Sequence, residues 1–170
     1  MDLLDRIFAQ MVEYFQGDPR RIQHFVKVHA FARLIGHMEG LDTAVQQRLE
    51  AAAYVHDIGI KAAEEKFGSS SGKLQEQEGP PEARKLLEKT GLDPEDVERI
   101  CYLVGHHHTY TGVDGADYRI LLEADFLVNL YERPTGREGI RQALHHIFKP
   151  ETGIKFCKTM FGLNISQENA

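Results

Sequence analysis

A histidine and an aspartate stand together at the end of an apolar helical segment, LEAAAYVHDIG. An apolar stripe steps toward His56 by four, three and four residues, from Val45 through Leu49 and Ala52. This spacing places His56 on the face that a helix normally buries, and Asp57 follows it into the interior. A protein core seldom holds a carboxylate without a compensating positive charge. The pair therefore predicts a bound metal ion, and with it an enzyme or the relic of one.

Three other expected helices also carry a metal-capable side chain on an apolar face: His24, His107 and Asp125. One such histidine alone is more often a core residue whose ring is satisfied by a backbone carbonyl. Four helices with the same feature are harder to explain in that way, and aspartate is rarely buried without a partner. Imidazole and carboxylate ligands suit Fe, Mn, Co, Ni, Zn or Mg ions. No cysteine pair has ligand spacing, which excludes a structural zinc ribbon.

The order of these residues resembles the HD-domain superfamily of metal-dependent phosphohydrolases. The resemblance covers residues 23–129 and is carried by HDIG after an apolar helix and by EADFLVN later in the chain. It implies an all-α helical bundle with a metal site between its helices. It further implies that one divalent metal ion is held by His24, His56, Asp57 and Asp125.

Some members of that superfamily bind a second metal through additional histidines. This chain has the later histidine pair, within His106–His108, but no histidine lies between His56 and His106. Alignment of the segment EARKLL with the family pattern puts Glu78 at the missing position. The resemblance therefore implies that a second ion is possible, held by Glu78, His106 and His107. His107 fits either register of the triple histidine, and His108 would face substrate or solvent.

The subgroup that cleaves cyclic dinucleotides resembles HDIGK followed by a GYP motif. This chain reads HDIGIK and has VDGADY in place of GYP, which argues against that subgroup. The shift moves the lysine to position 61. Lys61 could still reach a phosphate, although a solvated surface lysine is an equally good interpretation.

These features predict a phosphohydrolase that acts on a small phosphorylated substrate, such as a nucleotide. Metal-activated water would attack phosphorus, with Asp57, His107 and Lys61 as the catalytic residues. A spare histidine of the triple could protonate the leaving group. One alternative is a di-iron oxygenase of the same superfamily. The other is a non-catalytic domain that binds a nucleotide or a partner protein.

The composition limits the number of domains, the compartment and the partners that these functions can have. The chain has 170 residues, 42% of them hydrophobic, which suits one compact domain over residues 1–170. Two cysteines form no disulfide framework, and no segment has the length of a membrane span or a leader, so a cytoplasmic, membrane-free protein is expected. The net charge of −6 argues against nucleic-acid polymers as partners.

Periodicity and punctuation predict helices along almost the whole chain. They are expected over residues 2–15, from 19 to 36 or 40, 42–57, 81–90, from 94 to the triple histidine, 119–131, 137–148 and after 150. Asp18 and Asp93, each followed by proline, should cap two of them. Residues 66–81 are rich in Gly, Ser and Pro and predict a loop, with residues 66–78 acting as a lid or specificity element.

Overall fold

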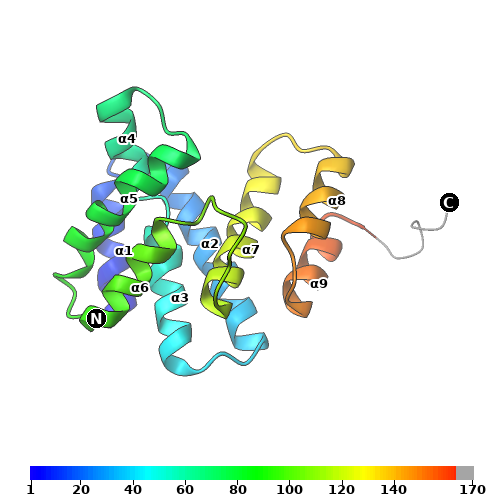
Figure 1. Ribbon diagram of the computed structural model, residues 1–170, viewed down its shortest axis with the longest axis horizontal. Helices are drawn as coiled ribbons and strands as arrows, with labels where there is room; N and C mark the ends of the chain where they lie inside the picture. The colour runs from blue at the N-terminus through cyan, green and yellow to red at the C-terminus, as the bar shows by residue number, and fades with distance from the viewer. Residues whose placement is uncertain (164–170) are drawn as a thin grey trace.

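The computed structural model describes residues 1–163, which form nine α-helices and no strand within that range (Figure 1). The helices are α1 (Leu3–Tyr14), α2 (Pro19–Met38), α3 (Thr43–Val55), α4 (Gly59–Phe67), α5 (Gly72–Leu87), α6 (Pro94–Val104), α7 (Ala116–Glu132), α8 (Arg137–His146) and α9 (Glu151–Met160). The prediction of an all-α fold is confirmed. One domain over residues 1–170 stays a prediction.

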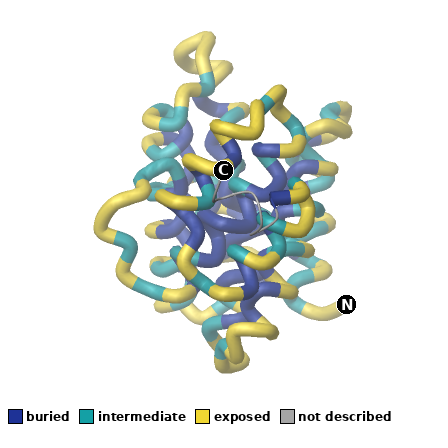
Figure 2. The backbone as a smooth tube through the Cα atoms, turned by 90° about the vertical axis from the view of Figure 1, so that its right-hand side faces the viewer, coloured by how far each residue is buried: buried dark blue, intermediate teal, exposed yellow. Residues whose placement is uncertain are grey.

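The helices α2, α3 and α7 occupy the middle of the bundle in Figure 1, and α2 packs against both of the others. On one side α5 packs against α4 and α6, and on the other side α8 and α9 follow α7. The backbone is most buried where these layers meet (Figure 2). The core side chains include Ile7, Met11, Val28, Ile35, Leu49, Ile100, Leu103, Leu121 and Leu127.

Aspartates fix the starts of four helices. The side chains of Asp2, Asp18, Asp42 and Asp93 each accept a hydrogen bond from a backbone N–H of the following first turn. Replacing such a cap by alanine typically costs about 1 kcal/mol. The caps predicted at Asp18 and Asp93 are confirmed.

The prediction of a loop over residues 66–81 is wrong, because α5 begins at Gly72 and continues through Pro80 and Pro81. The two prolines remove backbone N–H donors from the helix, which normally disfavours it. Close packing offsets that cost: a Cβ at Gly59 would lie 2.6 Å from the backbone nitrogen of Gly79, so α4 and α5 touch through backbone. The loop is confined to residues 68–71. A role of residues 66–78 as a lid or specificity element stays a prediction.

Within residues 1–163, no helix combines the length and the apolar character that crossing a membrane requires.

Candidate metal centre

Two histidines stand just beyond the ends of helices whose last carbonyls have no intrahelical partner. His56 follows α3, and its Nδ1 donates to the carbonyl of Ala53 at 2.9 Å. His107 follows α6, and its Nδ1 donates to the carbonyl of Val104 at 2.8 Å. Each hydrogen bond assigns the ring proton to Nδ1 and leaves Nε2 as the atom available to a metal ion.

The third histidine, His24, is held by a carboxylate instead. Its Nδ1 donates to Oε2 of Glu132 at 2.8 Å, and the other oxygen of Glu132 accepts from Nζ of Lys27 at 2.7 Å. His24 lies near the start of α2, whereas Glu132 is the last residue of α7. The two helices are therefore antiparallel here, and their contact turns Nε2 of His24 toward the interior.

Four side chains from three segments bring their ligand atoms together at one point. Nε2 of His24 lies 3.3 Å from Nε2 of His56 and 3.1 Å from Oδ1 of Asp125. Nε2 of His56 lies 3.5 Å from the same oxygen of Asp125. Oδ2 of Asp57 lies 3.4 Å from Nε2 of His24 and 3.5 Å from that of His56.

These separations match those of atoms that share one ion. Ligands about 2.0–2.2 Å from a divalent metal ion lie roughly 3–3.5 Å from one another. Because both Nδ1 atoms carry a proton, the facing Nε2 lone pairs of neutral His24 and His56 would repel each other without a cation or proton between them. The donor set therefore fits a divalent cation of the kind that imidazole and carboxylate bind.

A second group of ligand atoms adjoins the first and shares Asp57 with it. Oδ1 of Asp57 lies 3.3 Å from Nε2 of His107, off the direction of a hydrogen bond, and this buried nitrogen has no hydrogen-bond partner. Ligand atoms of Asp57, His107 and His108 lie within 4.8 Å of one another. The orphaned nitrogen of His107 marks this group as a second position suited to a cation.

The histidines and the carboxylates of the first group stabilise each other's charged forms. Burial would lower the pKa of His24, but its hydrogen bond to Asp125 and the charge of Asp57 raise that pKa to about 9. Burial likewise opposes a charged His56, but the carboxylates of Asp57 and Asp125 raise its pKa. Although burial would raise the pKa of both aspartates, the surrounding histidines hold it below the usual range. Without metal, the protonated rings of His24 and His56 therefore balance the charge of the ionised carboxylates.

A family model described as the HD domain matches residues 21–153. The chain belongs to the HD-domain family. The match includes the whole stretch whose order of histidines and aspartates resembles that family, so the resemblance is confirmed.

The HD-domain chain is also similar to the crystal structure of a predicted HD superfamily hydrolase from an uncultured Thermotogales bacterium. The two share 25% sequence identity and a TM-score of 0.66, over 92% of this chain and 83% of that chain. No match was found among curated proteins.

The structure brings together all four residues that the resemblance implies for one metal ion, His24, His56, Asp57 and Asp125. It also brings His107 to the adjoining group.

It does not bring Glu78 or His106 to either group. The Glu78 carboxylate is engaged by Lys66 of α4 and by Gln77. His106 is stacked on Tyr102, with ring centroids 4.1 Å apart, and its Nδ1 bonds the Tyr102 carbonyl. Of the three consecutive histidines, His107 and His108 contribute to the second group of ligand atoms.

Lys61 also lies away from both groups. Its Nζ lies 3.4 Å from the carbonyl of Tyr14 and sits over the ring of that tyrosine, 5.3 Å from its centroid. The neighbouring Ile60 lines the pocket beside the metal centre, but Lys61 does not. This placement agrees with the interpretation as a surface lysine, and a contact of Lys61 with a phosphate stays a prediction.

Three polar residues that sequence reasoning missed support the site. Asn129 donates to Oδ1 of Asp125 at 2.7 Å, and Gln75 contacts Nε2 of His108 at 3.0 Å through its Oε1. Glu132 holds His24, as described above. The residues at 125, 129 and 132 follow a helical spacing of four and three, which is the signal that could have found two of these three.

A pocket of about 340 Å³ opens beside the first group of ligand atoms, and His24 and Asp57 form part of its wall. Asn129 and Gln75 also line it, with charged side chains from the start of α2 and the end of α7. Its volume lies at the low end of the range for small-molecule sites.

Proposed function

We propose that this HD-domain chain is a metal-dependent phosphohydrolase that acts on a small phosphorylated molecule, such as a nucleotide. The observation that carries the proposal is the position of Asp57. One of its oxygens faces Nε2 of His24 and His56 at 3.4 and 3.5 Å, and the other faces Nε2 of His107 at 3.3 Å. A carboxylate placed between two sets of ligand atoms suits a site for two adjacent ions.

The chain's residues have distinct roles in this proposal. The first divalent ion would be held by His24, His56, Asp57 and Asp125. A second ion would be held by Asp57, His107 and His108. When bound, such ions lower the pKa of water and neutralise charge on phosphoryl oxygens.

The supporting hydrogen bonds give the site its orientation. Asn129 fixes the carboxylate of Asp125 from one turn further along α7, and Glu132 fixes the tautomer of His24. Asn129 and Gln75 line the pocket in which the substrate would bind. The net charge of −6 favours small substrates over nucleic-acid polymers.

His108 does not suit the role of a proton donor. Burial, and then the charge of His107, lower the pKa of His108 to about 4. At about pH 7 its ring is therefore neutral, which suits a metal ligand rather than a general acid. We propose that the leaving group takes its proton from water in the pocket.

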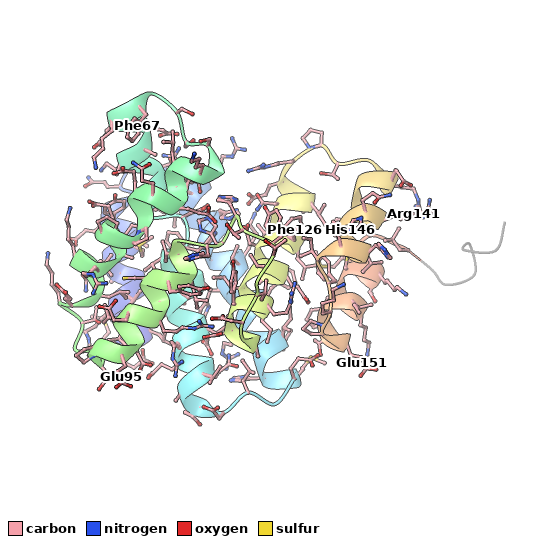
Figure 3. The ribbon with its side chains drawn as sticks, in the orientation of Figure 1. Phe67, Glu95, Phe126, Arg141, His146 and Glu151 are labelled. Atoms are coloured by element: carbon pink, nitrogen blue, oxygen red, sulfur yellow. The ribbon has the colours of Figure 1, made fainter. Side chains whose placement is uncertain are left out.

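The experiment is phosphate release from a panel of nucleotides and simple phosphomonoesters. The chain is stripped by a chelator and then reconstituted with Mn²⁺, Co²⁺, Ni²⁺, Zn²⁺ or Mg²⁺. We expect turnover that needs a divalent ion and is lost in Asp57→Asn. Glu95→Gln, on the exposed start of α6 (Figure 3), is the matched control and should keep full activity. No turnover of any phosphoester by the metal-loaded chain would contradict the proposal.

The same bridging position of Asp57 would suit a di-iron oxygenase, which is the second candidate. Repeating the assay under argon separates the two. A hydrolase keeps its turnover without dioxygen, whereas an oxygenase loses it. Binding without any turnover would instead favour a non-catalytic domain.

A further inference from the structure

Two arginines at the edge of the pocket have no carboxylate to balance them. Arg20 and Arg133 both line the pocket whose wall includes the metal ligands His24 and Asp57. Both are exposed, and among residues 1–163 neither makes an ion pair. They are therefore available to a bound anion.

Prolines fix the backbone position of both arginines. Pro19 begins α2, so Arg20 stands in the first turn of that helix. Pro134 follows Arg133 and disfavours a helical conformation there, which ends α7 with Arg133 extended at φ −109° and ψ 143°. Because α2 and α7 are antiparallel at this end, the start of one and the end of the other meet at the pocket.

The other charged side chains of the pocket are already paired. Arg21 lies 3.2 Å from Asp18 and 2.7 Å from Glu64. The carboxylate of Glu132 is shared between Lys27 and His24. Arg20 and Arg133 are thus the cationic groups of the pocket edge that no carboxylate among residues 1–163 neutralises, in a chain whose overall charge is −6.

We infer that Arg20 and Arg133 bind a second anionic group of the substrate, apart from the phosphoryl group that the metal centre would hold. The guanidinium group binds phosphate and carboxylate oxygens through two parallel hydrogen bonds, so either anion would suit. The substrate class is thus narrowed to small phosphoesters with a phosphate or carboxylate at the other end. This inference rests on the proposed function, because that function puts a phosphoryl group at the metal centre.

The test compares three phosphonate probes of equal length, which have a C–P bond in place of the phosphoester bond that the proposed reaction cleaves. Butylphosphonate ends in a methyl group, phosphonobutyrate in a carboxylate and propylenebisphosphonate in a second phosphonate. Their affinities for the Mn²⁺-loaded full chain are measured by calorimetry. We expect the doubly anionic probes to bind about fivefold to tenfold more tightly than butylphosphonate. A gain for the bisphosphonate alone would show that the second group is a phosphate.

Substitution of the arginines tests whether they cause the preference for doubly anionic probes. The double variant Arg20→Gln/Arg133→Gln should lose the preference for the doubly anionic probes, and Arg20→Lys/Arg133→Lys should keep part of it. The matched control is Arg141→Gln/Lys155→Gln on α8 and α9, which removes the same charge at positions that do not line the pocket, with Arg141 labelled in Figure 3. It should keep the whole preference. Circular dichroism checks that all variants are folded.

Two results would overturn the inference. One is equal affinity of the unsubstituted chain for all three probes, and the other is a preference that survives in Arg20→Gln/Arg133→Gln. The proposed function fails by a different result, the absence of metal-dependent phosphate release. A chain without hydrolysis that still preferred the doubly anionic probes through these arginines would retain the two-anion pocket.

Discussion

Glu132 accepts a hydrogen bond from Nδ1 of His24 at 2.8 Å, and this contact leaves Nε2 of His24 facing Asp125 at 3.1 Å. The histidines at 56 and 107 use backbone carbonyls for the same purpose. His24 is thus the member of these three whose orientation can be tested by a side-chain substitution.

We expect Glu132→Gln to weaken metal binding about tenfold, because the carboxylate that fixes the His24 tautomer and raises its basicity is lost. The measurement is the dissociation constant for Mn²⁺ or Co²⁺. Glu138→Gln, an exposed position in the first turn of α8, is the control and should leave it unchanged. Equal metal affinity in Glu132→Gln and the unsubstituted chain would remove the role given to this carboxylate.

The second prediction concerns the number of ions. His107→Ala should lower the metal stoichiometry from about two toward one, because it removes one of the three ligands proposed for the second ion. His106→Ala is the neighbouring control and should not change stoichiometry, since its ring stacks on Tyr102 outside both groups. Metal content is measured by plasma emission after equilibrium dialysis. An unsubstituted chain that saturates with one ion would contradict a binuclear site.

The third prediction is a release of protons on metal binding. The pKa of His24 is raised to about 9, so at about pH 7 the metal-free ring is protonated and must lose a proton to bind an ion. Metal affinity should therefore rise as the pH increases to about 9. Calorimetry in buffers of different ionisation enthalpy counts the protons. Uptake without proton release at about pH 7 would show that the ligands are already neutral in the metal-free chain.

How far the sequence predicts the site depends on whether the residues lie inside helices. His24 and Asp125 lie within α2 and α7, and His56 directly follows α3, so helical periodicity identified the faces that meet. The triple histidine follows the end of α6 at Val104, where periodicity no longer applies. The sequence therefore does not decide which two of these histidines face the site. In the structure, His108 rather than His106 joins the second group.

The remaining errors also have physical causes. Glu132 lies 108 residues from His24 in the sequence, and no local pattern joins them. The part of α5 before residue 81 is predicted as a loop because its glycines and prolines favour a loop locally, whereas the close contact of Gly59 and Gly79 favours the helix. The pattern of residue types thus predicts which side chains are buried, but contacts between distant segments decide which of them meet.

The fourth prediction concerns Glu123, a buried carboxyl that faces away from the metal centre. Its Oε1 accepts from the backbone N–H of Lys149 at 2.7 Å, while its Oε2 is buried without a partner. Burial raises the pKa of Glu123 from 4.5 to about 8. Between about pH 4.5 and 8 the folded chain therefore keeps a proton on Glu123 that the unfolded chain has lost.

The direction in which stability changes with pH follows from this difference in the pKa of Glu123 between the folded and the unfolded chain. The stability that protonated Glu123 contributes is fully present below 4.5 and is lost as the pH rises through about 8. Glu123→Gln does not titrate, so relative to the unsubstituted chain it should gain stability between about pH 5 and 8, on the order of a few kcal/mol. Urea unfolding of the metal-free chains across this range measures the gain. A constant difference between the two would mean that the carboxyl is already ionised when folded.

The central claim is that water attacks phosphorus in the pocket beside Asp57. The most direct measurement is turnover of a phosphomonoester in heavy-oxygen water under argon, with the released phosphate analysed by mass spectrometry. We predict one heavy oxygen in each phosphate, none in the alcohol, and no turnover in Asp57→Asn. Label in the alcohol, or turnover that requires dioxygen, would contradict it.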